Sequence, residues 1–257
     1  MKNELNELLQ FAVELGRGAG EITLEYFRKD PETETKSDGS YVTIADRHAE
    51  SYLREEIGKR YPDDGVVGEE ELEQRGLSGR RWIVDPIDGT FAFVHGVPFY
   101  GVLIALEIEG EPVLGVVNMP ALGEIVYAAK GIGCFLNGEP ASVSKSAELK
   151  DALLLATDFT SCAKHGFGHA AELLQGRAKA SRTWGDCYGY VLVATGRADV
   201  MLDPVMNLWD CAPLLPIMEE AGGTFTDWRG VRTISGGNSI ATNGLLFDEL
   251  MRLVRDR

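Results

Sequence analysis

The strongest constraint on the fold is a run of short apolar segments joined by tight turns in the middle of the chain. Residues 82–84, 100–107, 113–118 and 124–129 have the length and composition of strands. The connection between the second and third, Glu-Gly-Glu-Pro at 109–112, is a turn and is too short for a crossover. The sequence therefore predicts a sheet that contains antiparallel neighbours.

Helices are predicted on both sides of these strands. Apolar residues recur at helical spacing over residues 5–22, which indicates a long amphipathic helix. A polar stretch, residues 36–40, breaks this pattern, and a second helix follows over about 44–60, with Thr43 as its N-cap and Asp46 three residues later. After the central strands, the sequence predicts strands at 153–157 and 200–202 and helices at 170–174, 188–194 and 212–221, the last ended by two glycines.

Helices and strands interspersed without a regular βαβ order favour an α/β fold of layers with mixed or antiparallel sheets, and not a barrel. A chain of 257 residues is long enough for one large domain or two closely joined lobes. We expect a single unit over residues 1–257, with one lobe at about 1–145 and the other at about 146–257. The lobes are expected to meet between Ser142 and Asp151.

Composition limits the classes of partner. The formal net charge of −15 argues against non-specific nucleic-acid binding, which depends on Lys and Arg, and against docking to an anionic membrane surface. The four cysteines are far apart and form no Cys-x-x-Cys pair, which fits free thiols in a reducing compartment. The sequence contains neither a signal-peptide core nor an apolar run of membrane-spanning length. We therefore expect a soluble, cytoplasmic protein with no nucleic-acid or membrane partner.

The most informative motif is Asp-Pro-Ile-Asp-Gly-Thr at residues 85–90. Asp85 ends an apolar strand, the proline after it favours an immediate turn, and Gly89 allows an unusual backbone angle. In such a turn the Asp85 and Asp88 carboxylates and the Ile87 carbonyl can face one point, and this is an all-oxygen set of the kind that Mg²⁺ prefers. From the hexapeptide alone, the alternative is a plain turn in which the aspartates cap backbone amides.

Three further acidic sites have the same ambiguity. Glu69 and Glu70 follow the apolar pair at 66–67, so they lie either at the end of a strand or in a solvated acidic loop. Asp46 is either a ligand or the acidic partner of a capping box, and Asp210 is either a ligand or the N-cap of the helix that follows. If some of these carboxylates bind cations, the negative charge of the chain no longer excludes an anionic substrate.

Taken together, these motifs resemble one enzyme family. Val-Thr-Ile-Ala-Asp ending at Asp46, Gly-Glu-Glu at 68–70, the hexapeptide at 85–90 and Trp-Asp at 209–210 resemble, in order and spacing, the inositol monophosphatase family of metal-dependent phosphatases. The resemblance covers nearly the whole chain, because it extends to residues 93–99, 115–117, 131–135, 194–199 and 220–223. None of the metal ligands that the family pattern leads us to expect is missing.

The resemblance implies an architecture and an assembly. It implies a layered αβαβα sandwich, a homodimer, and two or three Mg²⁺ ions in each active site, with Li⁺ as an inhibitor. The lobe at about 1–145 would bind the metals, and the lobe at about 146–257 would bind the substrate.

The resemblance also implies which residues hold the metals. Glu69, Asp85 and the Ile87 carbonyl would hold the first ion. Asp85, Asp88 and Asp210 would hold the second.

Catalytic roles follow from the same resemblance. Asp46 and Glu69 would help to hold a third, looser ion, Asp46 would hydrogen-bond Thr90, and Glu70 would be a supporting glutamate. Thr90 is expected to orient the attacking water, and the backbone amides of Gly89 and Thr90 can bind a phosphate oxygen. Hydrolysis of a phosphate monoester needs charge neutralisation and a nucleophile formed at neutral pH, and Mg²⁺ supplies both.

The alcohol half of the ester is expected to be recognised by the segment at 182–190, Arg-Thr-Trp-Gly-Asp-Cys-Tyr-Gly-Tyr. This segment resembles the histidinol-phosphatase branch of the family more than the inositol phosphatases, and residues 99–106 and 226–230 do so too. Histidinol phosphate carries an ammonium group and an imidazole that is partly cationic near neutral pH. Asp186, with Asp203 nearby, would stabilise these cations, although Asp186 can also be read as a helix cap.

The sequence thus predicts hydrolysis of L-histidinol phosphate to L-histidinol and phosphate, a step of histidine biosynthesis. The alternatives are an inositol-1-phosphatase, a broad sugar-phosphate phosphatase, and a non-catalytic metal-binding relative, which the intact set of ligands disfavours. Substrate contacts are expected at Gly89, Thr90, Arg182, Asp186, Asp203 and Asp210.

Overall fold

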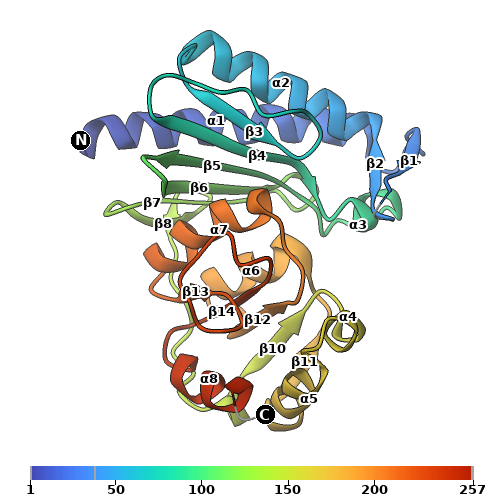
Figure 1. The fold of residues 1–257 in the computed structure, drawn as a ribbon, viewed down its shortest axis with the longest axis vertical. Coiled ribbons are helices and arrows are strands. Elements are labelled where there is room, and N and C mark those ends of the chain that lie inside the picture. The colour runs from blue at the N-terminus through green and yellow to red at the C-terminus, as the bar shows by residue number, and fades with distance from the viewer. Residues whose placement is uncertain (1, 38, 256–257) are drawn as a thin grey trace.

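Two sheets of different size organise the chain in the computed structural model, which describes residues 2–37 and 39–255 (Figure 1). Asp38, within the polar stretch predicted at 36–40, lies outside the described residues, as do Met1, Asp256 and Arg257. Helices lie outside each sheet and between the two, so the layers follow the order helix, sheet, helix, sheet, helix. The predicted αβαβα sandwich with mixed and antiparallel sheets is confirmed.

The first sheet has seven strands in the order β3-β4-β5-β6-β7-β8-β9. Neighbouring strands in this sheet are antiparallel, except β3 and β4, which are parallel to each other. Its strands are β3 (Gly65–Gly68), β4 (Arg80–Asp88), β5 (Gly101–Ile108), β6 (Glu111–Met119), β7 (Glu124–Ala129), β8 (Gly133–Leu136) and β9 (Glu139–Pro140).

The second sheet has five strands in the order β11-β10-β12-β14-β13, with β10 parallel to both of its neighbours and the other pairs antiparallel. A separate hairpin, β1 with β2, precedes the first sheet. These strands are β1 (Thr33–Thr35), β2 (Tyr41–Thr43), β10 (Leu153–Ala156), β11 (Ala180–Arg182), β12 (Val200–Asp203), β13 (Thr224–Thr226) and β14 (Ser239–Thr242). The first sheet thus ends at residue 140 and the second begins at 153, while the division of roles between two lobes stays a prediction.

Three helix layers enclose and separate the sheets. The first layer, α1 (Lys2–Tyr26) and α2 (Ile44–Arg60), covers the outer face of the first sheet, and α6 (Asp186–Ala194) and α7 (Leu208–Glu220) fill the middle. The third layer, α4 (Phe159–Lys164), α5 (Gly168–Arg177) and α8 (Phe247–Arg255), covers the second sheet; short helices are α3 (Thr90–Val94), η1 (Pro120–Leu122) and η2 (Leu149–Asp151). Among the described residues, no helix combines the length and the apolar character needed to cross a membrane.

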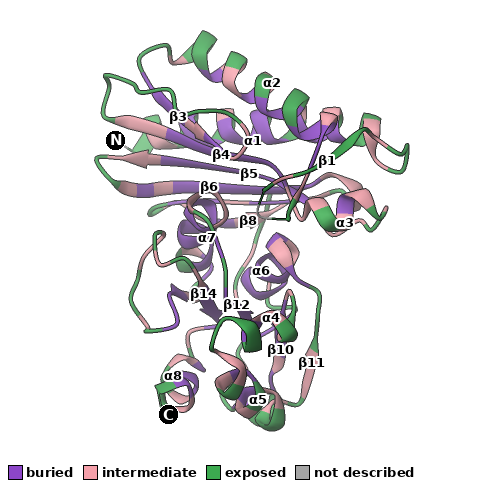
Figure 2. Ribbon diagram, turned by 45° about the vertical axis from the view of Figure 1, so that its right-hand side comes forward, coloured by how far each residue is buried: buried purple, intermediate pink, exposed green. Residues whose placement is uncertain are grey.

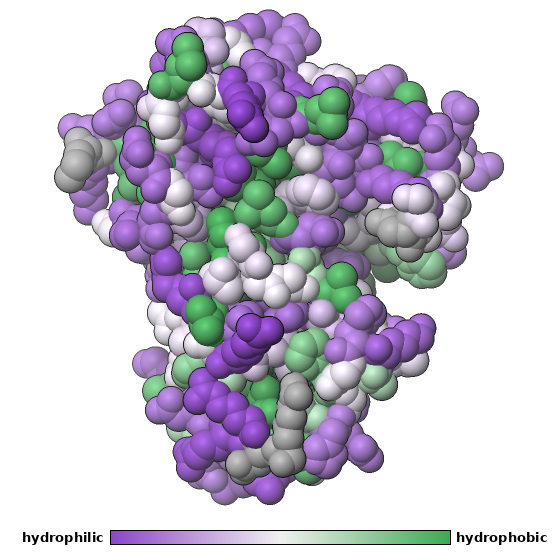
Figure 3. Space-filling model, viewed as in Figure 1, coloured by the Kyte–Doolittle hydropathy of each residue, from purple (hydrophilic) through white to green (hydrophobic). Residues whose placement is uncertain are grey.

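The strands of the first sheet are apolar on both faces because both faces are covered. Along β5, Val102 and Ile104 pack under α1 and α2, whereas Leu103 packs toward the middle layer. Burying an aliphatic side chain of this size contributes about 1.5–3 kcal/mol. Figure 2 shows the resulting buried band through the centre of the molecule. On the side drawn in Figure 3, hydrophilic residues predominate, with apolar residues gathered near the middle.

Most of the predicted elements are present. Thr43 is the N-cap of α2 and forms a capping box with Asp46, as predicted. The turn between β5 and β6 is shorter than expected, since only Glu109 and Gly110 connect the strands and both have positive φ angles of 52° and 82°. The sequence did not predict β13, β14 or α8, which complete the second sheet and its outer layer.

Candidate metal centre and substrate cavity

Two candidate ligands come from an irregular end of β4. The strand does not stop at Asp85 as predicted but continues to Asp88, and its register against β5 shifts between these two residues. The Ile87 amide donates to Asp85 Oδ1 at 3.0 Å, which holds the bulged backbone. Gly89 follows with a φ of 82°, and a Cβ there would lie 2.8 Å from the Phe99 carbonyl oxygen. Glycine is therefore required at position 89, and the bulge directs both aspartates to one side.

A third candidate ligand comes from the first turn of α7. Asn207 is the N-cap, and Asp210 accepts a hydrogen bond from the Asn207 amide at 2.6 Å. Asp210 is thus the acidic partner of a capping box and not the N-cap that one interpretation of the sequence suggested. The helix places Asp210 so that one carboxylate oxygen from each of Asp85, Asp88 and Asp210 lies within 4.8 Å of the others.

These three carboxylates perturb one another. Burial, followed by the Glu69 and Asp88 carboxylates, raises the pKa of Asp85 well above its ordinary value. Burial also raises the pKa of Asp88, and burial together with Asp88 raises that of Asp210. Because like charges at this separation disfavour joint ionisation, full ionisation of the cluster requires a positive charge among its members.

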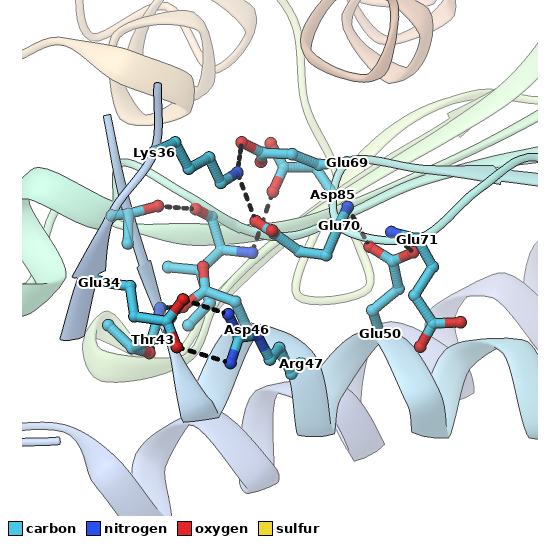
Figure 4. A network of polar contacts seen from close by, with 12 residues as sticks. Glu34, Lys36, Thr43, Asp46, Arg47, Glu50, Glu69, Glu70, Glu71 and Asp85 are labelled. Carbon is cyan, nitrogen blue, oxygen red and sulfur yellow. Dashed lines mark hydrogen bonds and ion pairs between the residues drawn. The ribbon is translucent and has the colours of Figure 1, made fainter. Parts of the chain in front are cut away.

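Glu69 and Glu70 extend this cluster from the end of β3, as the sequence predicted for a strand end. Lys36, which follows β1, places Nζ at 2.7 Å from Glu69 Oε1 and 2.7 Å from Glu70 Oε1 (Figure 4). Burial alone would lower the pKa of the Lys36 ammonium, but its bonds to the two glutamates raise it. Burial raises the pKa of Glu70 to about 7. Sequence reasoning missed Lys36 and interpreted the polar stretch around it only as a turn.

Asp46 reaches the same region from the first turn of α2. Its Oδ2 accepts hydrogen bonds from the Thr43 amide at 2.8 Å and the Thr43 hydroxyl at 2.6 Å. Its Oδ1 is buried and has no hydrogen-bond partner among the residues that the structure describes. Burial, opposed by the Thr43 hydrogen bonds, raises the pKa of Asp46 to about 6.

The expected hydrogen bond between Asp46 and Thr90 is absent from the described part of the chain, so that expectation is wrong. The Thr90 hydroxyl donates instead to the Ile87 carbonyl at 2.9 Å, within its own loop. The helix cap occupies one Asp46 oxygen and leaves the other unpartnered.

The residues present fit a hard cation. The donor set is entirely oxygen, which is the preference of Mg²⁺ and Ca²⁺, and three of its carboxylates converge within 4.8 Å. The buried, unpartnered Asp46 oxygen is an unsatisfied acceptor nearby, and a cation is one of the few groups that can satisfy such an atom without a donor hydrogen.

A cavity opens beside this cluster. It has a volume of about 280 Å³ and is lined by the carboxylate-bearing residues Asp88, Asp158, Asp186, Asp203 and Asp210. Among the described residues that line it, none is Lys, Arg or His, and Leu103, Tyr190, Met206 and Leu214 supply apolar wall. The cavity therefore favours a cationic group over a neutral one.

Asp186 joins the cavity to the metal cluster. It is the first residue of α6, and its φ of 49° is unusual for a residue other than glycine and costs about 1–3 kcal/mol. Its amide donates to Thr157 Oγ1 at 2.8 Å, and the next amide, of Cys187, donates to Asp88 Oδ2 at 2.6 Å. Gly185 is the N-cap of α6 and no side-chain cap bond is present there, so the interpretation of Asp186 as a helix cap is wrong. Burial, then the Asp88 carboxylate, raises the pKa of Asp186 well above its ordinary value.

Asp203, at the end of β12, also lines this cavity. Its Oδ2 accepts from the Tyr190 hydroxyl at 2.8 Å and its Oδ1 from the Thr157 amide at 3.4 Å. Burial raises the pKa of Asp203 to about 7. Arg182 is not among the residues that line the cavity: its side chain is exposed and donates to the Ser181 carbonyl at 2.7 Å.

Comparison with known proteins agrees with this geometry. Residues 4–257 match the model of the inositol monophosphatase family. The chain is 48% identical, over 91% of each chain, to a histidinol-phosphatase of Chlorobaculum parvum, and 41% identical, over 95% of this chain and 96% of the other, to a histidinol-phosphatase of Mycobacterium tuberculosis. Its fold resembles the extragenic suppressor protein suhB of Bartonella henselae with a TM-score of 0.91, 30% identity, and coverage of 97% and 99% of the two chains.

These relatives include named phosphatases, whose reaction is the hydrolysis of phosphate monoesters, and the family is generally metal-dependent. Among the described residues, Asp85, Asp88 and Asp210 form an acidic cluster that could bind a metal. The protein belongs to the inositol monophosphatase family and is a phosphatase.

Proposed function

We propose that this phosphatase depends on Mg²⁺ and hydrolyses L-histidinol phosphate to L-histidinol and phosphate, a step of histidine biosynthesis. The observation that carries the proposal is the cavity beside the acidic cluster, which five aspartates line without a basic residue among its described lining. Two relatives that align over nearly the whole chain are named histidinol-phosphatase, which supports the same substrate.

The chain supplies ligands for two or three ions. Glu69, Asp85 and the Ile87 carbonyl would hold one, and Asp85, Asp88 and Asp210 a second. The unpartnered oxygen of Asp46, together with Glu69, would hold a third. When bound, Mg²⁺ lowers the pKa of water and neutralises phosphoryl oxygens.

Thr90 is suited to orient the water that attacks phosphorus. Its hydroxyl hydrogen is committed to the Ile87 carbonyl at 2.9 Å, so its oxygen is left to accept a hydrogen bond from a water. The backbone amides of Gly89 and Thr90 would donate hydrogen bonds to a phosphate oxygen. Glu70, whose pKa burial raises to about 7, lies beside this site as a supporting acid.

Asp186 and Asp203 would select the alcohol half of the ester. Both line one cavity that also includes Asp88 and Asp210, so the alcohol of an ester whose phosphoryl group binds at the cluster would lie in the cavity beside them. An ammonium or imidazolium there gains charge-assisted hydrogen bonds, about 1.5–3 kcal/mol each, whereas a neutral polyol would leave buried carboxylates without a cation.

The experiment that tests this proposal is parallel steady-state kinetics with Mg²⁺ on histidinol phosphate, inositol 1-phosphate and a hexose phosphate. We expect the highest kcat/KM on histidinol phosphate. A second candidate is an inositol-phosphate or sugar-phosphate phosphatase, favoured by 35% identity to a fructose-1,6-bisphosphatase/inositol-1-monophosphatase of Thermotoga maritima. Higher kcat/KM on inositol 1-phosphate or the hexose phosphate would establish that second function in place of the first.

We also propose that the protein is a cytoplasmic homodimer. Its four cysteines are buried and unpaired, which suits a reducing compartment. Exposed apolar side chains such as Phe91, Val97 and Trp184 offer surface for a second copy. Light scattering after size-exclusion chromatography measures the assembly directly, and the mass of a single chain at micromolar concentration would contradict a homodimer.

A further inference from the structure

Glu50 is a fully buried carboxylate that lies outside the predicted ligand set. It is on α2, one helical turn after Asp46, and has 0% of its surface exposed. Its charge is balanced by Arg54 on the next turn, whose Nε donates to Glu50 Oε1 at 2.8 Å. Burying an ion pair of this kind costs desolvation free energy. Further hydrogen bonds to the Glu50 carboxylate are needed to offset that cost.

Those contacts are with the backbone beside the metal centre. The Glu70 amide donates to Glu50 Oε2 at 2.8 Å, and the Glu71 amide donates to Glu50 Oε1 at 3.0 Å (Figure 4). Arg54 adds a third bond, because its Nη2 donates to the Glu71 carbonyl at 3.0 Å. The segment directly after β3, which carries Glu69 and Glu70, is therefore tied to α2 by these three hydrogen bonds, and the Ser51 hydroxyl of α2 adds a fourth, to Glu71 Oε1 at 3.3 Å.

Gly68 makes this close approach possible. A Cβ at position 68 would overlap the Glu50 carboxylate, so only glycine lets the chain pass close enough for the amides to bond. Asp46 and Glu50 are four residues apart and lie on the same face of α2. One rigid helix thus carries Asp46 and, through Glu50, fixes where Glu69 lies relative to it.

We propose that Glu50 is a positioning residue of the metal centre: its carboxylate, through the amides of Glu70 and Glu71, holds Glu69 at the distance from Asp46 that cation binding requires. This inference rests on the proposed metal dependence and is independent of the substrate. Outer groups that orient metal ligands commonly change metal affinity or activity about 10- to 100-fold when they are replaced.

Glu50→Gln tests the proposal. Glutamine keeps the shape but has one acceptor oxygen, and its amide group would oppose either a backbone N–H or the Arg54 guanidinium. We expect the affinity for Mn²⁺, measured by the electron paramagnetic resonance signal of the free ion, to fall about 10- to 100-fold. The Mg²⁺ concentration for half-maximal phosphate release should rise in parallel, while KM for the ester at saturating Mg²⁺ is unchanged.

Two further variants separate positioning from folding. Glu55→Gln alters a glutamate on the same helix whose side chain is 66% exposed, and it should bind Mn²⁺ as the wild type does. Arg54→Lys keeps a cation beside Glu50 but cannot maintain all of the arginine's bonds, so a smaller loss of Mn²⁺ affinity is expected even if Glu50→Gln fails to fold.

The outcomes distinguish the two proposals. If Glu50→Gln folds and binds Mn²⁺ with wild-type affinity, or if Glu50→Gln does not fold and Arg54→Lys binds Mn²⁺ with wild-type affinity, Glu50 is only structural and this inference is overturned. If the wild type itself binds no Mn²⁺, the proposed metal dependence falls and this inference falls with it.

Discussion

Replacing Asp88 by asparagine should change activity and stability in opposite directions. The substitution keeps the shape of the side chain, and an asparagine oxygen can still accept the 2.6 Å hydrogen bond from the Cys187 amide. What it removes is one negative charge from a group of three carboxylates within 4.8 Å of one another. Loss of one preorganised electrostatic group costs about 100- to 1,000-fold in kcat, and we expect a loss of at least the lower figure at saturating Mg²⁺.

The stability of the metal-free protein should increase. Two unit charges 4.8 Å apart repel by about 3.5 kcal/mol at an effective dielectric constant of about 20. The metal-free protein relieves part of this by binding protons, because the pKa of Asp88 is raised by burial. We therefore expect a gain of about 1–3 kcal/mol in the free energy of unfolding at neutral pH. Because the folded pKa lies above the unfolded one, the gain should vanish below about pH 4 and grow as the pH rises.

Two assays decide the matter: phosphate release with saturating Mg²⁺, and thermal unfolding in excess chelator, where 1 kcal/mol corresponds to about 2–4 °C for a chain of this size. Asp151→Asn is the matched control, because Asp151 is exposed in η2, away from the cluster, and it should change neither reading. Near-normal turnover by Asp88→Asn would refute the reasoning and leave Asp88 as a turn residue. A lower melting temperature in chelator would refute the electrostatic part alone.

Three further predictions follow from the site. Chelation should abolish phosphate release, Mg²⁺ should restore it, and Li⁺ should inhibit it, so full activity in excess chelator would contradict the mechanism. Asp186→Asn should raise KM for histidinol phosphate about tenfold or more, the scale of one charge-assisted hydrogen bond, with little effect on glycerol 2-phosphate; equal losses on both would make Asp186 structural. The pKa of Asp203 is raised by burial to about 7, above the unfolded value. Its contribution to metal-free stability is therefore fully present below about pH 4 and is lost as the pH rises through 7. In chelator, the melting temperature should therefore fall less steeply between about pH 4 and pH 7 for Asp203→Asn than for the wild type. An unchanged slope would show that Asp203 does not titrate in this range.

The sequence predicted the elements in which an apolar pattern continues over many residues or in which a capping residue marks the end. α1 and α2 were predictable because apolar spacing and the Thr43 cap coincide. The strands β5 and β6 were predictable because both faces of their sheet are buried and most of their residues are apolar. By contrast, β13 and β14 are three and four residues long. β13 pairs with β14, and β14 pairs with β12, more than thirty residues earlier in the chain, a contact that local pattern does not encode.

The residues of the candidate site also fall into those that the sequence predicted and those that it did not. The acidic residues were found because their spacing within short motifs is distinctive, and the structure brings Asp85, Asp88 and Asp210 together. Lys36 was missed because a single lysine has no local pattern, and its contact with Glu69 and Glu70 depends on a segment more than thirty residues away in the chain. The hydrogen bond of Thr90 was predicted wrongly because the choice between Asp46 and the Ile87 carbonyl depends on how the loop closes.

The arrangement of the middle layer explains how so many carboxylates can meet. Asp186 and Asp210 lie in the first turns of α6 and α7, and the Cys187 amide at the start of α6 donates to Asp88. The partial positive charge of a helix N-terminus stabilises such a carboxylate by about 0.3–1 kcal/mol, which is well below the repulsion of about 3.5 kcal/mol estimated for one pair of charges at this separation. The helix ends therefore offset only part of the repulsion, and the remainder can be offset by bound protons in the metal-free protein or by a bound cation. Ligand binding stabilises the folded state by about 2.7 kcal/mol at one hundred times the dissociation constant, so the free energy of unfolding should depend on metal concentration as directly as the activity does.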